Sequence, residues 1–291
     1  MNKGLFVGLC GLDVVFYEDK PLPAEDLKMK VGDVRACIGG PAANAAITFS
    51  LLGGESTVLT YIGNSAVGRV IKQQMSDYGI KVIDLCADDD VKCISSIYVN
   101  KSASTRTILS GRNPIYKLKD FSVIKDAVED CGFILYDGHF SQLDDVLLPM
   151  AHDLKKDIVI DVGAWKDSFD KILRYNPTLI CSEVFNKNGL NGIELMKEYG
   201  YTQTAITRGS KSILCKTADM EETVEVPAKK VLAIDTLGAG DVFHGAYCHF
   251  RYNEDLPFIA AINGAAEVAG ISTTACGVVD GVKEYLAVSA K

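Results

Sequence analysis

The chain lacks the marks of a nucleic-acid-binding or membrane protein. Its 30 lysines and arginines are outnumbered by 38 aspartates and glutamates, which gives a formal charge of −8 at pH 7. No cluster of basic residues offsets this acidity, so we expect no nucleic-acid partner. No apolar stretch approaches the roughly 20 residues that span a bilayer, so we expect no membrane partner either. A small-molecule ligand is the remaining expectation.

Paired cysteines are also missing. The total is odd, no C-x-x-C pair occurs, and the cysteines are scattered along the chain, which is typical of buried thiols in a reducing cytoplasm. The apolar start Gly4–Cys10 superficially resembles a secretory signal. Asp13 follows it closely and no small-residue cleavage site is obvious, so we interpret this segment as a first buried strand. The nine cysteines are Cys10, Cys37, Cys86, Cys93, Cys131, Cys181, Cys215, Cys248 and Cys276.

Internal repeats, low-complexity segments and flexible linkers are absent too, so residues 1–291 are expected to form one domain. Helices and strands alternate, which favours an α/β fold with a mostly parallel sheet covered on both faces and sites at the carboxyl ends of its strands. Helices are predicted at Pro41–Leu52, Ala66–Tyr78, Phe121–Asp130, Leu143–Lys155, Phe169–Tyr175 and Phe258–Thr273. Strands are predicted at Thr57–Ile62, Phe133–Tyr136, Ile158–Val162, Leu179–Cys181 and Ala205–Thr207, with antiparallel strands at Ile213–Lys216 and Thr223–Val226.

Four extended segments do not follow this alternation. Asp13–Tyr17 and Val31–Ile38 flank a polar, proline-bearing loop, and Cys93–Asn100 and Arg106–Ser110 resemble a hairpin joined by a polar turn. We expect them to form a small β-sheet outside the core, inserted as segments of approximately 13–38 and 91–111.

The segment Asp235–Asp241 (Asp-Thr-Leu-Gly-Ala-Gly-Asp) is the most informative part of the chain. It stands between Val231–Ile234, interpreted as a buried strand, and a helix predicted over Asp241–Tyr252. A glycine turn at a helix start is an anion site, because the first backbone N–H groups lack acceptors within the helix. Asp241 would repel that anion. It is therefore either a general base for an alcohol that attacks phosphorus or a simple helix cap.

Together with a second motif, this segment resembles a known family. Gly39–Ala46 (Gly-Gly-Pro-Ala-Ala-Asn-Ala-Ala) and Tyr61–Gly68 resemble the N-terminal signature of the ribokinase-like carbohydrate kinases, also called the phosphofructokinase B family, and Asp235–Asp241 resembles their C-terminal signature. The resemblance covers essentially the whole chain. It implies a ribokinase-like three-layer α/β/α core with a mostly parallel sheet and a small β-sheet lid over a sugar.

The resemblance also implies a reaction, namely phosphorylation of a sugar hydroxyl by ATP with Mg²⁺ through in-line transfer of the γ-phosphoryl group. Asp241 would be the base, and backbone amides of Gly238, Ala239 and Gly240 would hold the moving phosphoryl group. The residues expected to bind the sugar are Asp13, Gly39, Gly40, Asn44, Arg106 and Asp137.

The nucleotide side follows the family pattern less closely. The residues expected to bind ATP are Ser182, Thr207, Gly209, Thr236, Gly238, Gly240 and Asn263. The family's metal-organising glutamate is missing from Ser182–Phe185, so either Glu183 substitutes for it through water or the ATP phosphates and water hold the magnesium. The family resemblance alone suggests that Asp235 helps to hold a monovalent cation such as potassium.

Alternative functions remain open. The same scaffold suits a nucleoside kinase or a sugar-phosphate kinase, and the latter would need cations such as Arg35, Arg106 or Arg112 at the sugar end. The altered Ser182–Phe185 segment also leaves room for a non-catalytic sugar-binding relative. The sequence does not identify the sugar. Apolar residues of the lid, Ile94, Ile97 and Val99, are expected to be exposed and to support a homodimer through the lid.

Overall fold

The computed structural model describes residues 2–23, 26, 28–87, 93–103, 105–111 and 121–290. Arg112 and parts of the two predicted lid segments lie outside the described residues.

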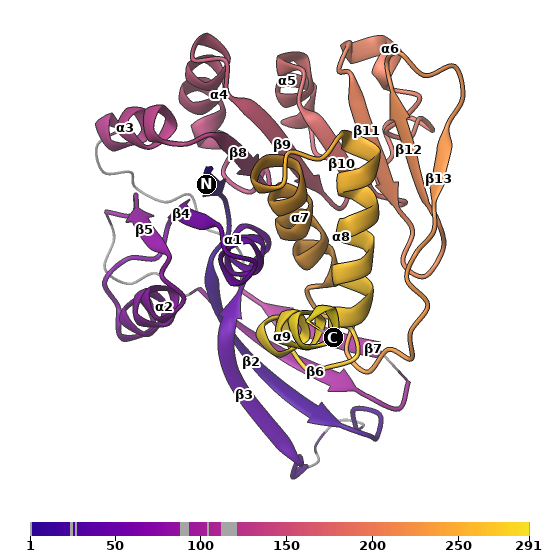
Figure 1. Cartoon of the computed structure of the whole chain (residues 1–291). Helices are drawn as coiled ribbons and strands as arrows, with labels where there is room; N and C mark the ends of the chain where they lie inside the picture. Colours follow the sequence, from indigo (N-terminus) through magenta and orange to yellow (C-terminus); the bar gives the residue numbers. More distant parts are fainter. Residues whose placement is uncertain are drawn as a thin grey trace.

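A mixed sheet of nine strands, in the order β13-β12-β11-β10-β9-β8-β1-β4-β5, forms the centre of the described chain (Figure 1). All neighbouring strands run parallel except β11, β12 and β13, which pair antiparallel at one edge. The mostly parallel sheet with an antiparallel edge is therefore confirmed. The strands are β1 Lys3–Val7, β4 Glu55–Thr60, β5 Lys81–Asp84, β8 Phe133–Tyr136, β9 Asp157–Val162, β10 Thr178–Ser182, β11 Gln203–Thr207, β12 Ile213–Thr217 and β13 Val224–Val226.

Helices cover both faces of this sheet (Figure 1). Side chains of successive strand residues point to opposite faces, so Phe6 belongs to one hydrophobic cluster while Leu5 and Val7 belong to the other. Residues of α1, α2, α7, α8 and α9 complete the first cluster, and residues of α3 to α6 complete the second. The helices are α1 Pro41–Leu51, α2 Ala66–Asp77, α3 Ser122–Asp130, α4 Asp144–Asp153, α5 Phe169–Ile172, α6 Met196–Tyr199, α7 Ala239–Cys248, α8 Phe258–Ser272 and α9 Val278–Ser289.

One predicted element is wrong. Val231–Ile234 is not a strand, and Leu232 is 89% exposed. The backbone N–H groups of Ile234 and Asp235 donate to Thr273 O at 2.7 and 3.0 Å. This segment therefore hydrogen-bonds to the residue that follows α8 rather than entering the sheet, which explains why an apolar run lies at the surface.

The helix after this segment begins earlier than predicted. α7 starts at Ala239 rather than Asp241, and beyond Cys248 it continues as a single π-helical turn, His249–Asn253. The early start places Asp241 in the first helical turn, beside the backbone amides of the glycine turn.

A second sheet of four strands, in the order β3-β2-β6-β7, extends from one end of the core (Figure 1). Its central pair, β2 and β6, is parallel, and both outer pairs are antiparallel. These strands are supplied by the two excursions that the sequence predicted. They are β2 Gly11–Glu18, β3 Asp33–Gly39, β6 Ile94–Asn100 and β7 Thr105–Ser110.

The inner face of the small sheet packs onto the core. Ile97 and Val99 are each 2% exposed and cluster with Val15 and Tyr17, so the prediction that these two residues are exposed is wrong. They are covered because Leu237 and Cys276 pack against the same cluster. Ile94 is 39% exposed, and every residue of the outer strand β7 is exposed.

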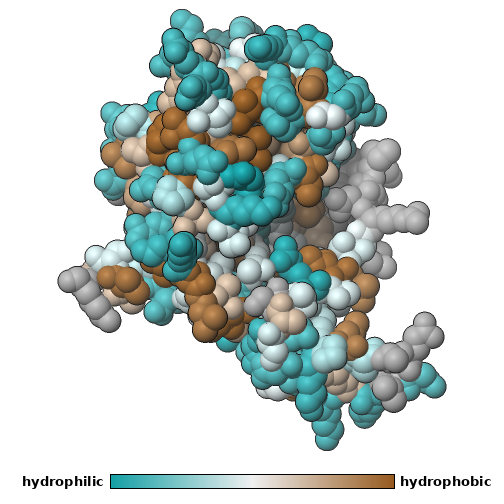
Figure 2. Space-filling view, turned by 90° about the vertical axis from the view of Figure 1, so that its right-hand side faces the viewer, coloured by the Kyte–Doolittle hydropathy of each residue, from teal (hydrophilic) through white to brown (hydrophobic). Residues whose placement is uncertain are grey.

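The surface, the helices and the cysteines can be compared with what the sequence predicts about membranes and thiols. Hydrophobic and hydrophilic side chains are interspersed on the face that carries the β13 edge (Figure 2). Within the described residues, no helix combines the length and the apolar character needed to cross a membrane. Cys10, Cys131, Cys181, Cys215 and Cys248 are buried free thiols.

Candidate active site

The turn before α7 has a geometry that only glycine adopts readily. Gly238 is the N-cap of α7 with φ of 74°, and a Cβ atom there would lie 2.6 Å from Val278 Cγ2. Val242 N donates to Gly238 O at 2.8 Å, which closes the first helical turn. Ala239 and Gly240 therefore lie at the helix start, where N–H groups lack intrahelical acceptors and the dipole favours an anion.

Asn44 and Asp241 are brought together by α1 and α7, which lie side by side in Figure 1. Asn44 Nδ2 donates to Asp241 Oδ2 at 2.7 Å. The Asn44 side chain is buried, and within the described residues its Oδ1 atom has no hydrogen-bond partner. The amide thus holds the carboxylate with one atom and leaves an acceptor for a ligand hydroxyl with the other.

Asp241 lies in an acidic environment. Burial, followed by the nearby carboxylate of Asp161, raises the pKa of Asp241 to about 7, while the hydrogen bond from Asn44 opposes the shift. Burial also raises the pKa of Asp161, at the carboxyl end of β9. A carboxyl group with a pKa near neutrality accepts a proton more readily than an ordinary aspartate does, which suits a general base.

His244 of α7 lies beneath these carboxylates. Its Nδ1 atom is 2.8 Å from Gly240 O and 3.4 Å from Asp161 Oδ2, and its Nε2 atom is 3.2 Å from Ile180 O. Neither His244 nor Asp161 was predicted from the sequence to belong to this site. Asp161 could have been found, because it stands at the carboxyl end of a correctly predicted strand.

Asp137, which is predicted to contact the substrate, is buried and accepts hydrogen bonds from the protein. It accepts hydrogen bonds from Leu9 N at 2.7 Å and His139 N at 3.0 Å, and its Oδ1 atom lies 3.2 Å from His139 Nδ1. Burial alone would raise the pKa of Asp137, but the charge and hydrogen bonds of His139 lower it. Asp137 therefore orients the loop after β1 and the imidazole of His139.

A cavity of about 210 Å³ lies between the small sheet and the core, and Asp13, Gly39, Gly40 and His139 line it. A Cβ atom on Gly39 would lie 2.0 Å from Asp13 Oδ2, so glycine leaves room for that carboxylate. Gly40 has φ of 101°, and its Cβ atom would lie 2.3 Å from Leu9 O. The structure thus brings three predicted sugar-binding residues, Asp13, Gly39 and Gly40, into one cavity. The other lining residues are Leu9, Gly11, Cys93, Ile94, Ser95, Ser110 and Gly111.

Arg106 connects the small sheet to the glycine motif. Its Nη1 atom, on β7, donates to Thr236 Oγ1 at 3.0 Å, and the residue is exposed. Arg106 is not among the residues that line the 210 Å³ cavity. It joins the small sheet to the segment that opens the glycine motif, and its role in substrate binding stays a prediction.

The predicted nucleotide residues follow neighbouring strands. Ser182 and Thr207 are register partners at the ends of β10 and β11, and Gly209 has φ of 62° in the turn that follows. Ser182 Oγ donates to Gly163 O at 2.9 Å, and Thr207 Oγ1 donates to Cys181 O at 3.3 Å. Asn263 is exposed on α8. Ser182 and Thr207 thus lie side by side at the carboxyl ends of two parallel strands, and the binding of ATP by this set of residues stays a prediction.

Glu183 is exposed, and its Oε2 atom lies 3.3 Å from Lys211 Nζ. Its backbone N–H donates to Thr207 O at 2.9 Å. Among the described residues, no group of three or more His, Cys, Asp or Glu side chains is arranged to hold a metal ion. Glu183 remains a prediction as a contact to magnesium-bound water.

Comparison with known proteins identifies the family. The pfkB family of carbohydrate kinases matches residues 1–173 and 181–284. The chain belongs to that family. A ribokinase of Dictyostelium discoideum is 25% identical, over 95% of this chain and 96% of its own length. A deoxyribokinase of Salmonella typhi is also 25% identical, over 93% of this chain and 92% of its own length.

The fold of this pfkB kinase also agrees with solved structures. The ribokinase of Giardia lamblia superposes with a TM-score of 0.83 at 19% sequence identity, covering 100% of both chains. The ribokinase-like α/β fold and membership of the sugar-kinase family are therefore confirmed. The individual site residues stay predictions.

Proposed function

We propose that this pfkB kinase transfers the γ-phosphoryl group of ATP to a hydroxyl of an unphosphorylated monosaccharide, with Asp241 as the general base. The observation that carries the proposal is the position of Asp241, which lies in the first turn of a helix formed on a glycine turn and accepts a hydrogen bond from Asn44. Burial and Asp161 raise the pKa of Asp241 there to about 7, which suits a base. The sugar hydroxyl gives its proton to Asp241 while its oxygen attacks phosphorus. The amides of Gly238 to Gly240 then stabilise the charge on the transferring group.

The substrate end of the site supports a free sugar. Among the described residues that line the cavity of about 210 Å³ there is no lysine or arginine, which favours a free sugar over a sugar phosphate there. Arg35, named above as an available cation, is bonded to Asp33 and Asp280 instead. Asp13 can accept from sugar hydroxyls, and Asn44 Oδ1 can accept from one at the reacting end.

Magnesium would be carried mostly by the nucleotide. The described side chains offer no cluster of metal ligands, which suits an ion bound through ATP phosphates and water, with Glu183 reaching a bound water. When bound, the ion neutralises phosphate charge. The protein's own contribution is the positioning of the sugar by Asp13 and Asn44 and the acceptance of its proton by Asp241.

The small sheet would act as a lid within a single domain. Arg106 joins it to Thr236, and its inner face packs onto Leu237, so closure over a sugar would bear directly on the glycine motif. A homodimer through the lid remains a prediction.

A substrate screen tests the proposal. ADP formation is measured with ATP and Mg²⁺ against free pentoses and hexoses, nucleosides, and sugar phosphates. We expect turnover with at least one free sugar and little with its phosphate ester. Preferential turnover of a nucleoside or of a sugar phosphate would contradict the assigned substrate class. Tight sugar binding by calorimetry with no ADP formed from any substrate would contradict the kinase reaction and favour a binding protein.

A further inference from the structure

The carboxylate of Asp235 accepts three hydrogen bonds from the protein. Asp235 is 4% exposed, and its Oδ1 atom accepts from Leu237 N at 2.9 Å. Its Oδ2 atom accepts from Tyr17 Oη at 2.9 Å and from Gly277 N at 3.0 Å. These three donors take three of the roughly four lone-pair positions that a carboxylate offers, so little capacity remains for a cation.

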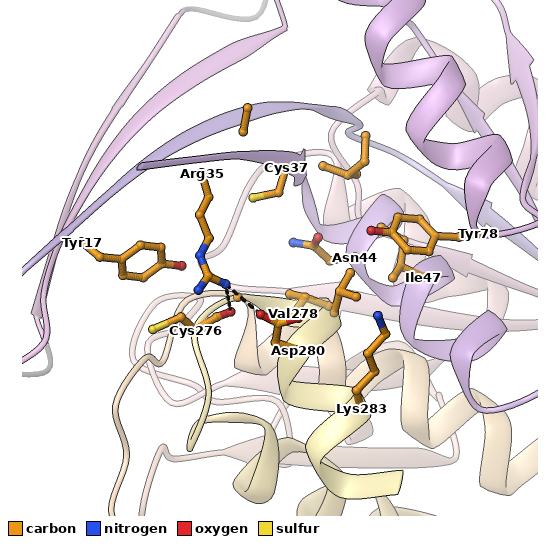
Figure 3. A pocket seen from close by; sticks show the side chains of 14 residues that line it. Tyr17, Arg35, Cys37, Asn44, Ile47, Tyr78, Cys276, Val278, Asp280 and Lys283 are labelled. Atoms are coloured by element: carbon orange, nitrogen blue, oxygen red, sulfur yellow. Dashed lines mark hydrogen bonds and ion pairs between the residues drawn. The ribbon is translucent and has the colours of Figure 1, made fainter. Parts of the chain in front are cut away.

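Two backbone carbonyl groups of the adjoining loop, those of Thr273 and Cys276, also accept hydrogen bonds. Thr273 O accepts from the backbone N–H groups of Ile234 and Asp235. Cys276 O accepts from Arg35 Nη1 at 3.0 Å, and the same nitrogen lies 2.8 Å from Asp280 Oδ2. Figure 3 shows the Arg35 side chain extending from β3 across a cavity to this loop and to the start of α9.

Arg35 brings a permanent positive charge to this place. Its guanidinium carbon lies 5.5 Å from the centre of the Tyr17 ring, and its Nε atom bonds Asp33 Oδ2 at 2.9 Å. An arginine stays protonated at any physiological pH and offers only donors. Potassium requires several oxygen atoms that replace its hydration shell. Asp235 Oδ2 and Cys276 O already accept hydrogen bonds, and the positive charge that Arg35 brings to Cys276 O would repel a second cation, so the residues present do not fit a monovalent cation at Asp235.

We infer that Arg35 and Tyr17 replace the monovalent cation that the family resemblance implies, so that this chain needs no potassium. The inference rests on the proposed kinase function for its catalytic consequence only. Tyr17 holds the carboxylate of Asp235, Asp235 holds Leu237 N, and Arg35 holds the loop at Cys276. These side chains act as positioning residues, because they fix the backbone before the glycine turn without touching the reacting atoms.

The direct test compares cations on the wild-type chain. Thermal unfolding, thallium-205 NMR with Tl⁺ as a potassium mimic, and turnover on the sugar found by screening are measured in potassium, sodium and choline chloride at equal ionic strength. We expect no bound thallium signal, no difference in Tm between potassium and choline, and equal turnover. A saturable thallium signal or a Tm raised by potassium over choline would overturn the inference. Both readouts are independent of turnover, so they remain decisive if the proposed reaction fails.

Variants test the two residues named. Arg35→Gln combined with Tyr17→Phe removes the arginine's charge, the Arg35 donor to Cys276 O and one of the two donors to Asp235 Oδ2, so the double variant is expected to acquire a potassium-dependent rise in Tm. Matched controls are Arg69→Gln, which removes a donor to Asn64 O at 2.8 Å, and Tyr98→Phe, which removes a donor to Lys20 O at 2.8 Å from the same small sheet. The controls should show no potassium response. A folded double variant without that response would contradict the assignment to Arg35 and Tyr17.

Discussion

The two ends of the segment Asp235–Asp241 carry the same residue type in opposite environments. Asp235 accepts three hydrogen bonds, two of them from the backbone N–H groups of Leu237 and Gly277. Asp241 accepts one hydrogen bond, from Asn44, and faces the carboxylate of Asp161, which together with burial raises its pKa to about 7. A carboxylate that accepts three hydrogen bonds supports the structure, whereas a buried one with a hydrogen bond from Asn44 and a carboxylate neighbour is ready to take a proton.

The largest expected effect comes from removing the reactive carboxylate. Asp241→Asn should lower kcat by on the order of 100-fold or more, because a general base is lost. Asn keeps a carbonyl oxygen for Asn44 to donate to, so the fold should survive. The exposed Asp153→Asn on α4 is the control and should retain wild-type turnover. Near-normal turnover in Asp241→Asn would remove Asp241 from the mechanism.

The same variant has a stability signature. The pKa of Asp241 is raised above its unfolded value, so the stability it contributes is present at low pH and is lost as the pH rises towards about 7. At pH 8, Asp241→Asn should therefore unfold at the same temperature as wild type or at a higher one. A Tm clearly below wild type at pH 8 would assign Asp241 a structural role instead.

The next effect concerns the turn between the two aspartates. Gly238→Ala should cost on the order of 1–3 kcal/mol of unfolding free energy from the left-handed backbone, with further loss from the contact with Val278, and turnover should fall. Gly79→Ala is the matched control, because Gly79 has φ of 71° and no heavy atom within 4 Å of an added Cβ. Equal losses in both variants would show that Val278 and the anion turn impose no extra constraint.

The smallest expected effect comes from removing the hydroxyl of Tyr17, which donates to Asp235. Tyr17→Phe should lower the unfolding free energy by about 1 kcal/mol, because Asp235 loses one of its three donors but keeps two backbone N–H groups. Urea unfolding measures this loss against Tyr98→Phe. A loss of kcat in Tyr17→Phe as large as that in Asp241→Asn would erase the difference between the two ends of the motif.

The spacing of apolar residues and the position of turn residues predicted much of the fold. The errors share one cause. Helices and strands with strong apolar periodicity fall within about two residues of their predicted ends, as at Phe133–Tyr136. Val231–Ile234 and the inner-face residues Ile97 and Val99 were misjudged because burial of short apolar runs depends on which distant segment covers them. The residues adjacent in sequence do not reveal that Ile234 bonds to Thr273, or that Leu237 packs against Ile97 and Val99.

The site divides in the same way. Asp13, Gly39, Gly40, Asn44 and Asp241 were selected from motifs, and the structure brings them to one edge of the core. Asp161, His244 and the donors around Asp235 were not foreseen. The position of Asp161 near His244 depends on the register between β9 and β10. The hydrogen bond from Tyr17 to Asp235 depends on how closely β2 approaches the motif. Both are set by contacts between segments distant in sequence.

The central claim is tested most directly by the pH dependence of kcat/KM, which reports groups of the free enzyme. It should fall as the pH drops through about 7, because Asp241 becomes protonated. In Asp161→Asn the fall should move to lower pH, because removing a neighbouring negative charge favours the ionised form of Asp241. A profile that stays level well below pH 7, or a fall that Asp161→Asn leaves in place, would contradict the assignment of Asp241 as the base.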